Sequence, residues 1–349
     1  MLIHPKFKLN GQSYSKKELI AHATDLSLKD QAFEKSIGKF ILDFLSESST
    51  LSVFTSGSTG TPKKIILKKA QMVNSAMATA SFFDLKEGHT ALLCLPAEFI
   101  AGKMMIVRAL VIGLALDYVA PNVYPLKNVE RTYDFCAMVP MQIQNSLAEL
   151  KKLKILIIGG APLPNNLKEQ LLDAPTRCFE TYGMTETITH IAIKPIQVDY
   201  FEALPHVDIF LDERDCLVID APQIADDKIV TNDMVELIDR KRFKWLGRYD
   251  NIINSGGIKL IPEIIEAKLA KSFKERYFVY GTPDEQLGEK LVLVIESKLS
   301  VQEIQKKLAI NAKLKRFEKP KTILTTPKFI LTDSGKVDRH KTMASLIKN

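Results

Sequence analysis

The chain has 349 residues, of which 46% are hydrophobic and 26% are charged, and its formal net charge is +7. This composition is typical of a globular protein with a large core and room for two domains. No apolar run reaches the roughly 18 residues of a membrane span, and the N-terminus lacks the apolar stretch of a signal peptide. We therefore expect a cytoplasmic protein that has no membrane partner.

The basic residues are scattered along the chain, without the aromatic-interleaved basic patch that is typical of nucleic-acid binding. No nucleic-acid partner is expected, and a basic surface also suits anionic small molecules. The four cysteines, Cys94, Cys136, Cys178 and Cys216, form no CxxC pair. This spacing favours reduced thiols in the core over a disulfide framework or a zinc site.

Hydroxyl side chains and glycines fill the segment between two short apolar runs, 51–54 and 65–67. Hydroxyls donate hydrogen bonds, and glycines let backbone N–H groups approach a ligand, so the segment suits a phosphate chain. It is not a Walker A loop, because Pro62 stands at the second glycine position and Lys63 is followed by Lys64. On these residues alone, an ordinary turn between two strands remains the alternative. The candidate phosphate-binding residues are Thr55, Ser56, Gly57, Ser58, Thr59, Gly60 and Lys63.

Further along the chain, apolar runs of strand length alternate with helical periodicity. Helices are predicted over 72–83 and 103–114, and buried strands over 90–96, 134–140 and 153–160. This alternation is the α/β pattern of a mostly parallel sheet covered by helices. Ligands of such sheets bind at the carboxyl ends of the strands, where the polar segments 159–163 and 180–187 are found.

After about residue 190 the pattern changes to antiparallel hairpins with charged turns, within 206–220 and 228–247. From residue 248 a smaller α+β unit is predicted, with helices over 262–273 and 301–309, strands over 276–281 and 290–297, and a polar tail. The predicted fold class is α/β: a large N-terminal α/β domain with a β-rich portion, 1–247, and a small mobile α+β C-terminal domain, 248–349.

Five polar segments, read together and in this order, resemble one enzyme superfamily. They are the loop that begins at Thr55 and the segments 181–186, 231–237, 247–257 and 332–339. Together they are similar to the adenylate-forming superfamily of acyl-CoA and aryl-CoA ligases, peptide-synthetase adenylation domains and luciferases. The resemblance implies that ATP, Mg²⁺ and coenzyme A take part, and that the first loop surrounds the β- and γ-phosphates of ATP.

The resemblance also assigns roles to single residues. Lys336 is the catalytic lysine that bridges the attacking carboxylate and the α-phosphate, and Glu186 is the Mg²⁺ ligand. Asp233 and Arg248 bind the ribose, and Tyr182 stacks on adenine. The backbone of Gly160 and Ala161 approaches the edge of the adenine ring, and Thr185 reaches a phosphate oxygen.

A second half-reaction is implied by the segment 254–266. In the superfamily, the C-terminal domain swings about a hinge, here matched by Asp250, after the adenylate has formed. The loop of Ser255, Gly256 and Gly257 then lines a narrow channel for the pantetheine thiol of coenzyme A. Without the resemblance, the two glycines are simply a hairpin turn.

Superfamily members usually have a longer region before the phosphate loop, so the N-terminal part is expected to be shortened here. Short chains of this type resemble o-succinylbenzoate-CoA ligases of menaquinone biosynthesis. Those enzymes commonly have an aromatic-histidine pair after Leu-Pro, whereas Leu95 and Pro96 are followed by Ala-Glu-Phe in this chain. A homodimer could replace the missing surface of the acid pocket.

The acid itself is assigned through an arginine in an apolar helix. Arg108 must find an anion or reach solvent, and the resemblance places it, with Gly183, beside the acid substrate. The alternative is that Arg108 pairs locally with Asp117 or Glu98. The predicted function is an ATP-dependent ligase that joins o-succinylbenzoate to coenzyme A. Alternatives are another acyl-CoA ligase, an enzyme that loads a carrier protein, and a catalytically silent ATP-binding protein.

Overall fold

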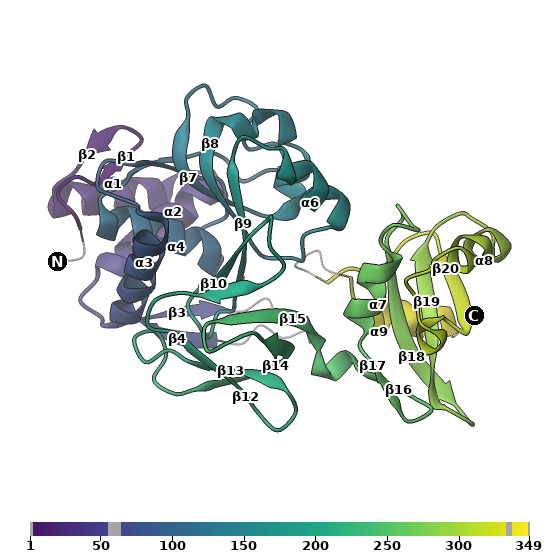
Figure 1. Ribbon diagram of the computed structural model, residues 1–349. Coiled ribbons are helices and arrows are strands. Elements are labelled where there is room, and N and C mark those ends of the chain that lie inside the picture. Colours follow the sequence, from purple (N-terminus) through teal and green to yellow (C-terminus); the bar gives the residue numbers. More distant parts are fainter. Residues whose placement is uncertain (1–2, 55–63, 333–336, 348–349) are drawn as a thin grey trace.

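The computed structural model describes residues 3–54, 64–332 and 337–347. They form a large α/β domain built on a 13-stranded sheet and a small α+β domain built on a 5-stranded sheet (Figure 1). The fold class predicted from the sequence is therefore correct. No helix in the described ranges is long and apolar enough to cross a bilayer.

The chain begins with a short hairpin and two helices that sequence analysis did not predict. Strands β1 (Lys8–Leu9) and β2 (Gln12–Ser13) are followed by α1 (Lys16–Leu28) and α2 (Ala32–Leu45). Ser15 and Glu18 form a capping box at the start of α1, which satisfies two backbone N–H groups of the first turn. The two helices pack against each other at one end of the large domain (Figure 1).

The predicted alternation of strands and helices follows. Strands β3 (Thr50–Phe54) and β4 (Lys64–Lys68) pair antiparallel, as expected of the runs that flank the phosphate loop. The next elements are α3 (Lys69–Phe83), β5 (Thr90–Leu93), α4 (Ile100–Ile112), β6 (Ala115–Tyr118), β7 (Tyr133–Met138), α5 (Pro140–Gln144), a 3-10 turn (Leu147–Lys152), β8 (Leu153–Ile158), α6 (Asn165–Leu172) and β9 (Arg177–Gly183).

The second half of the large sheet is antiparallel. It contains β10 (His190–Pro195), β11 (Phe201–Ala203), β12 (Asp208–Leu211), β13 (Cys216–Asp220), β14 (Ile229–Leu237) and β15 (Arg242–Arg248). The strand order is β12-β13-β14-β15-β11-β10-β9-β8-β7-β5-β6-β1-β2, and the strands from β9 to β1 are parallel. Strand β9 thus joins the parallel half to the antiparallel half.

The parallel strands are apolar on both faces because both faces are covered. In β7, Phe135 packs into the cluster with α3 and α4, whereas Cys136 packs into a second cluster with α6. This two-sided burial explains why the strands read as continuous apolar runs in the sequence. All four cysteines are free and buried, in agreement with the prediction.

The small domain has a separate sheet and separate cores. After a 3-10 turn (Tyr249–Asn251), it contains β16 (Ile253–Ser255), β17 (Ile258–Leu260), α7 (Pro262–Leu269), β18 (Tyr277–Asp284), β19 (Gly288–Glu296), α8 (Val301–Ala309), a 3-10 turn (Arg316–Glu318), β20 (Thr322–Thr326) and α9 (Arg339–Ile347). The last helix was not predicted, because it lies in what reads as a polar tail. Pro262 occupies the first turn of α7, as expected.

Candidate active site

The carboxyl ends of β7, β8 and β9 meet the start of α4 around a cavity of about 220 Å³. This is the edge of the parallel sheet at which ligands of α/β proteins bind. Four of the predicted site residues line it: Gly160, Thr185, Arg108 and Gly183. The remaining lining residues are Leu95, Ile100, Ala101, Ala137, Met138, Val139, Ile157, Gly159, Thr181, Met184, Thr189 and His190.

Three glycines, Gly159, Gly160 and Gly183, line the cavity at the ends of β8 and β9. Gly160 has a φ of +82°, a conformation that favours glycine, and it is exposed at the end of β8 together with Ala161. A Cβ on Gly183 would collide with the backbone of Thr189 and His190. The cavity can therefore receive a flat group against bare backbone, as expected for the adenine or the acid.

Arg108 lies on α4 with only 1% of its surface exposed. Its Nε donates to Thr79 Oγ1 over 3.3 Å, and its Nη2 donates to Thr189 Oγ1 over 3.5 Å. Nη1 has only the sulfur of Met105, a weak acceptor, at 3.9 Å. Because a guanidinium has five N–H donors, one N–H on each terminal nitrogen has no acceptor in the described part of the chain.

The alternative that Arg108 pairs with a local acid is wrong. Asp117 instead binds Arg131 over 3.2 Å. Neither Asp117, Glu98 nor any other carboxylate in residues 3–54, 64–332 and 337–347 forms an ion pair with Arg108. Burial without an anionic partner lowers the pKa of Arg108 to about 9. The guanidinium remains a cation at neutral pH, and it lines the cavity.

His190, which sequence analysis missed, is buried beside Arg108. Its Nε2 lies 3.2 Å from Thr79 Oγ1, and its Nδ1 lies 3.4 Å from Thr189 Oγ1. The proton of the Thr79 hydroxyl is donated to the carbonyl of Ser75, so Nε2 of His190 must be the donor to Thr79 and Nδ1 the acceptor. Burial, and then the charge of Arg108, hold the pKa of His190 well below its usual range.

Asp233, predicted to bind the ribose, lies on β14 with 7% of its surface exposed. Its Oδ2 accepts a hydrogen bond of 2.6 Å from the hydroxyl of Tyr182, and its Oδ1 accepts one of 3.1 Å from Trp245 Nε1. The ring of Tyr182 packs against Phe201 and Phe243. Burial and the carboxylate of Asp233 raise the pKa of Tyr182 far above its usual range, so its hydroxyl remains a donor. Its stacking on adenine stays a prediction.

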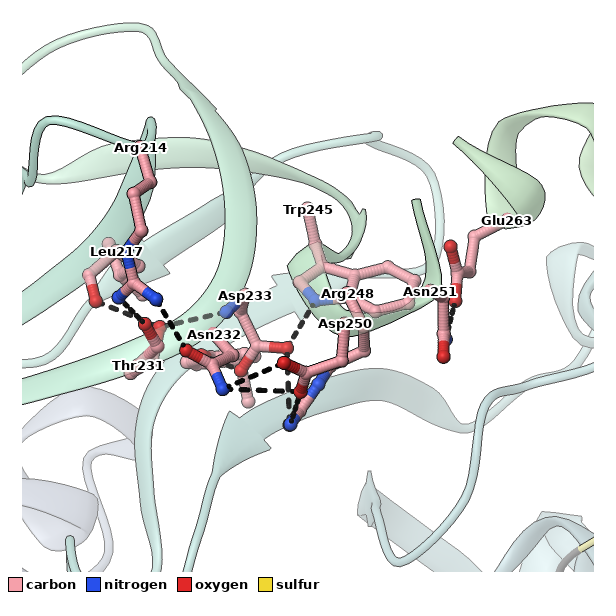
Figure 2. A network of polar contacts seen from close by, with 11 residues as sticks. Arg214, Leu217, Thr231, Asn232, Asp233, Trp245, Arg248, Asp250, Asn251 and Glu263 are labelled. Atoms are coloured by element: carbon pink, nitrogen blue, oxygen red, sulfur yellow. Dashed lines mark hydrogen bonds and ion pairs between the residues drawn. The ribbon is translucent and has the colours of Figure 1, made fainter. Parts of the chain in front are cut away.

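Arg248 and the predicted hinge residue Asp250 belong to the same polar network (Figure 2). Arg248 lies 2.9 Å from Asp250 Oδ2 and 3.9 Å from Asp233 Oδ1, so it is bound more closely to the hinge carboxylate. Asn232 donates to both oxygens of Asp250 and accepts from Arg214. These contacts connect the predicted hinge residue to the predicted ribose site.

Glu186 lies on the exposed turn after β9, next to Thr185, and forms no hydrogen bond or ion pair with another side chain within the described residues. The described part of the chain contains no cluster of three or more His, Cys, Asp or Glu that could hold a metal ion. One free carboxylate beside a phosphate site suits Mg²⁺, because this ion usually takes its other ligands from phosphate oxygens and water. The assignment of Glu186 to Mg²⁺ remains a prediction.

Gly256 and Gly257 form the turn between β16 and β17, and Ser255 is the last residue of β16, so the segment is the hairpin turn of the alternative interpretation. The φ angles of the two glycines, +59° and +79°, favour glycine. None of the three residues is among those that line the cavity. Its role in a coenzyme A channel remains a prediction.

Two predicted elements lie outside the described residues. They are Lys336 and the phosphate loop of Thr55, Ser56, Gly57, Ser58, Thr59, Gly60 and Lys63. The strands that flank the loop, β3 and β4, and the residues that flank Lys336, Thr332 and Val337, are described.

Comparison with known proteins agrees with this arrangement. A family model described as AMP-binding enzyme matches residues 21–225. The 2-succinylbenzoate–CoA ligase of Salmonella typhimurium is 26% identical over 325 residues, which cover 88% of this chain and 71% of the relative. The enzyme of the same name from Escherichia coli is 25% identical and covers 82% of this chain and 66% of the relative. The chain thus spans about two thirds of the length of these relatives.

Solved structures are similar as well. An acyl-CoA synthetase (AMP-forming)/AMP-acid ligase II-like protein from Dyadobacter fermentans is 32% identical, with a TM-score of 0.62 and coverage of 95% of this chain and 99% of that one. An o-succinylbenzoate CoA synthetase from Bacillus subtilis, in complex with its acyl-adenylate intermediate, shares the fold with a TM-score of 0.79 at 16% identity. The match covers 96% of this chain and 95% of that one. The match to the family model over more than half of the chain shows that the chain belongs to the AMP-binding enzyme family, and the shared fold agrees with this.

Proposed function

We propose that this protein is an AMP-forming acid–thiol ligase that converts o-succinylbenzoate to o-succinylbenzoyl-CoA for menaquinone biosynthesis. In the first step, a substrate carboxylate attacks the α-phosphate of ATP, which yields an acyl-adenylate and releases pyrophosphate. In the second step, the thiol of coenzyme A attacks the acyl carbon and AMP leaves. The observation that carries the proposal is Arg108, a buried cation that lines the cavity and has no carboxylate partner among the described residues.

The free donors of Arg108 suit the second carboxylate of the substrate. o-Succinylbenzoate carries two carboxylates, and only one of them is activated. The other needs a cationic partner, and the two N–H groups left on the guanidinium can bind it in bidentate fashion. A monocarboxylic acid would leave Arg108 buried without an anion, which is unfavourable.

The chemistry of the first step requires positive charge and no general base. A carboxylic acid with a pKa near 4 is already ionised at neutral pH, so the barrier comes from bringing two anions together. Lys336 supplies one charge beside the attacking oxygen. Mg²⁺, held by Glu186 and the phosphates, would neutralise the negative charge that the phosphates carry. Asp233, Arg248 and the backbone at Gly160 hold the nucleoside.

The named relatives support the choice of acid, since several of them are 2-succinylbenzoate–CoA ligases. This chain lacks the histidine that such enzymes commonly have after Leu-Pro. Its cavity nevertheless contains a histidine, His190, which is supplied by β10. A pocket with an arginine and a neutral histidine is therefore still available to an aromatic dicarboxylate.

ATP–pyrophosphate exchange with a panel of carboxylic acids tests the proposal directly. We expect exchange with o-succinylbenzoate, and release of AMP when coenzyme A is added. Exchange without thioester formation would indicate an enzyme that loads a carrier protein. Preference for a monocarboxylic acid would contradict the substrate, and the absence of exchange with every acid would contradict the ligase activity.

Three further features belong to the proposal. We propose that the domain boundary lies at residues 247–248, at the end of strand β15, that the enzyme acts in the cytoplasm, and that it forms a homodimer. Sedimentation of the purified protein tests the last point, because a dimer has twice the chain mass of 39.2 kDa.

A further inference from the structure

The only tryptophan of the chain contacts the carboxylate to which ribose binding is assigned. Trp245 Nε1 donates to Asp233 Oδ1 over 3.1 Å, while the hydroxyl of Tyr182 donates to the other oxygen over 2.6 Å. Figure 2 shows the indole beside Asp233, with Arg248 and Asp250 on the same side. Each oxygen of the carboxylate thus has one fixed protein donor.

A β-bulge aims the indole at Asp233. Along β14 and β15, Asp233 pairs with Arg248 and Met234 with Gly247, but Val235 pairs with Trp245. Leu246 is the extra residue of β15. Paired residues of antiparallel strands lie on the same face, so the bulge moves Trp245 to the face of Asp233 and Val235. In a regular ladder, Trp245 would pair with Glu236 and face the opposite side of the sheet.

The two donors are permanent. The indole N–H does not titrate, and the raised pKa of Tyr182 keeps its hydroxyl protonated. Each donor occupies one lone-pair direction, and among the described residues no second hydrogen bond reaches either oxygen, although Arg248 lies 3.9 Å from Oδ1. Two donors on opposite oxygens therefore fix the plane of the carboxylate and present one free lone pair on each oxygen. Vicinal hydroxyls, such as the 2′ and 3′ groups of a ribose, are suited to such a pair of acceptors.

We propose that Trp245 is a positioning residue for nucleotide binding, which holds Asp233 in the orientation that accepts both ribose hydroxyls. The inference rests on the proposed nucleotide site at Asp233. It adds a residue that acts through Asp233 and does not itself touch the nucleotide.

Calorimetric titration of the parent protein and of Trp245→Phe with AMP and with 2′,3′-dideoxy-AMP tests the inference. Phenylalanine keeps an aromatic ring but removes the N–H. We expect AMP to bind about 3- to 10-fold more weakly to the variant, the scale of losing one hydrogen bond. Binding of the dideoxy analogue should be unchanged, since it has no hydroxyls for Asp233 to accept. An equal loss for both ligands, or no loss for either, would show that Trp245 only packs.

Phe243→Leu is the matched control, because Phe243 packs on Tyr182 but donates nothing to Asp233. It should change the affinity for both ligands by the same factor. A parent protein that binds AMP and the dideoxy analogue equally well would contradict the ribose assignment of Asp233 itself. The other case is a parent protein that binds AMP more tightly than the dideoxy analogue. If the Trp245→Phe variant then shows the same ratio of affinities, only the role of Trp245 is contradicted.

The parent protein also provides a test that does not depend on the folding of a variant. With one tryptophan in the chain, a ¹⁵N correlation spectrum contains one indole N–H signal. We expect AMP to shift this signal more than dideoxy-AMP does, because only AMP engages the carboxylate that accepts the indole bond. Equal shifts with the two nucleotides would overturn the proposal.

Discussion

Arg108 and His190 contact the same atom, the hydroxyl oxygen of Thr79, from α4 and β10 respectively. The shared oxygen accepts from both side chains and donates its own proton to the backbone of α3. A neutral histidine is the form that this arrangement permits, because a second cation beside Arg108 would have no anion to offset it. The floor of the cavity therefore carries one positive charge.

Removing that charge should weaken binding of the acid and leave binding of ATP nearly unchanged. We expect Arg108→Met to raise the KM for o-succinylbenzoate about 10- to 100-fold, which corresponds to about 1.4 to 2.8 kcal/mol. Steady-state kinetics with each substrate varied in turn measures both constants. Arg131→Met is the control, because Arg131 pairs with Asp117 and does not line the cavity. If Arg108→Met binds the acid as well as the parent does, the guanidinium does not contact substrate.

The neutral state of His190 predicts how stability depends on pH. Its pKa is lowered in the folded protein, whereas an unfolded histidine titrates near 6.5. Below about pH 6.5 the unfolded state takes up a proton that the folded state does not, so the free energy of unfolding falls as the pH falls. The slope from this group is at most about 1.4 kcal/mol per pH unit, and the contribution is constant above pH 7.5 or so.

Urea denaturation at pH 5.5 and 7.5 measures this effect. We expect His190→Gln to reduce the difference in the free energy of unfolding between the two pH values. His206→Asn should leave the difference intact, because His206 is exposed and asparagine tolerates its positive φ of 64°. An unchanged pH dependence in His190→Gln would mean that His190 binds its proton equally well in the folded and unfolded states, which would contradict the lowered pKa.

The turn at Gly257 predicts a separation of the two half-reactions. Gly257→Leu should obstruct the proposed thiol channel, so that acyl-adenylate forms at the normal rate and accumulates when coenzyme A is present. Gly11→Leu is a matched control for backbone strain, since the φ angles are +79° and +80° and a Cβ has open space at both sites. Rapid-quench analysis of adenylate and thioester distinguishes the steps. Equal consumption of coenzyme A in both variants would show that the channel lies elsewhere.

Lys336 predicts the opposite separation. We expect Lys336→Ala to slow adenylate formation by about 100-fold or more, the scale of losing one major electrostatic stabiliser of the transition state. Formation of thioester from pre-made acyl-adenylate should be nearly unaffected, because the lysine is proposed to act only in the first step. The two rates are measured separately in single-turnover experiments. Equal losses in both steps would contradict the proposed domain swing.

Much of the fold could be predicted because the parallel strands are buried on both faces and read as continuous apolar runs, and because α3 buries residues at helical spacing. Helices α1 and α9 were missed for the opposite reason. Only three residues of α1 are buried, and α9 buries only Thr342 and Met343, so neither shows a clear apolar stripe. Local sequence then contains little information, and contacts with distant elements determine the structure.

The missed site residues have a similar explanation. Thr79 and His190 are 111 residues apart in sequence and meet only because α3 covers the start of β10. Trp245 reaches Asp233 only through the bulge at Leu246, whereas a regular alternation along β15 predicts the opposite face. A motif identifies the residues that touch the ligand. It contains no information about the other residues that hold these site residues in place.

The two sheets share no strand pair in the described residues, and the covalent link between them is the short segment 249–252. Each side of the link keeps a hydrophobic cluster of its own. In the proposed mechanism the link acts as a tether, which sets the effective concentration at the cavity of the domain that carries Lys336. Cleaved at this segment, the enzyme should become a bimolecular system, in which the rate of adenylate formation depends on the concentration of the added small domain.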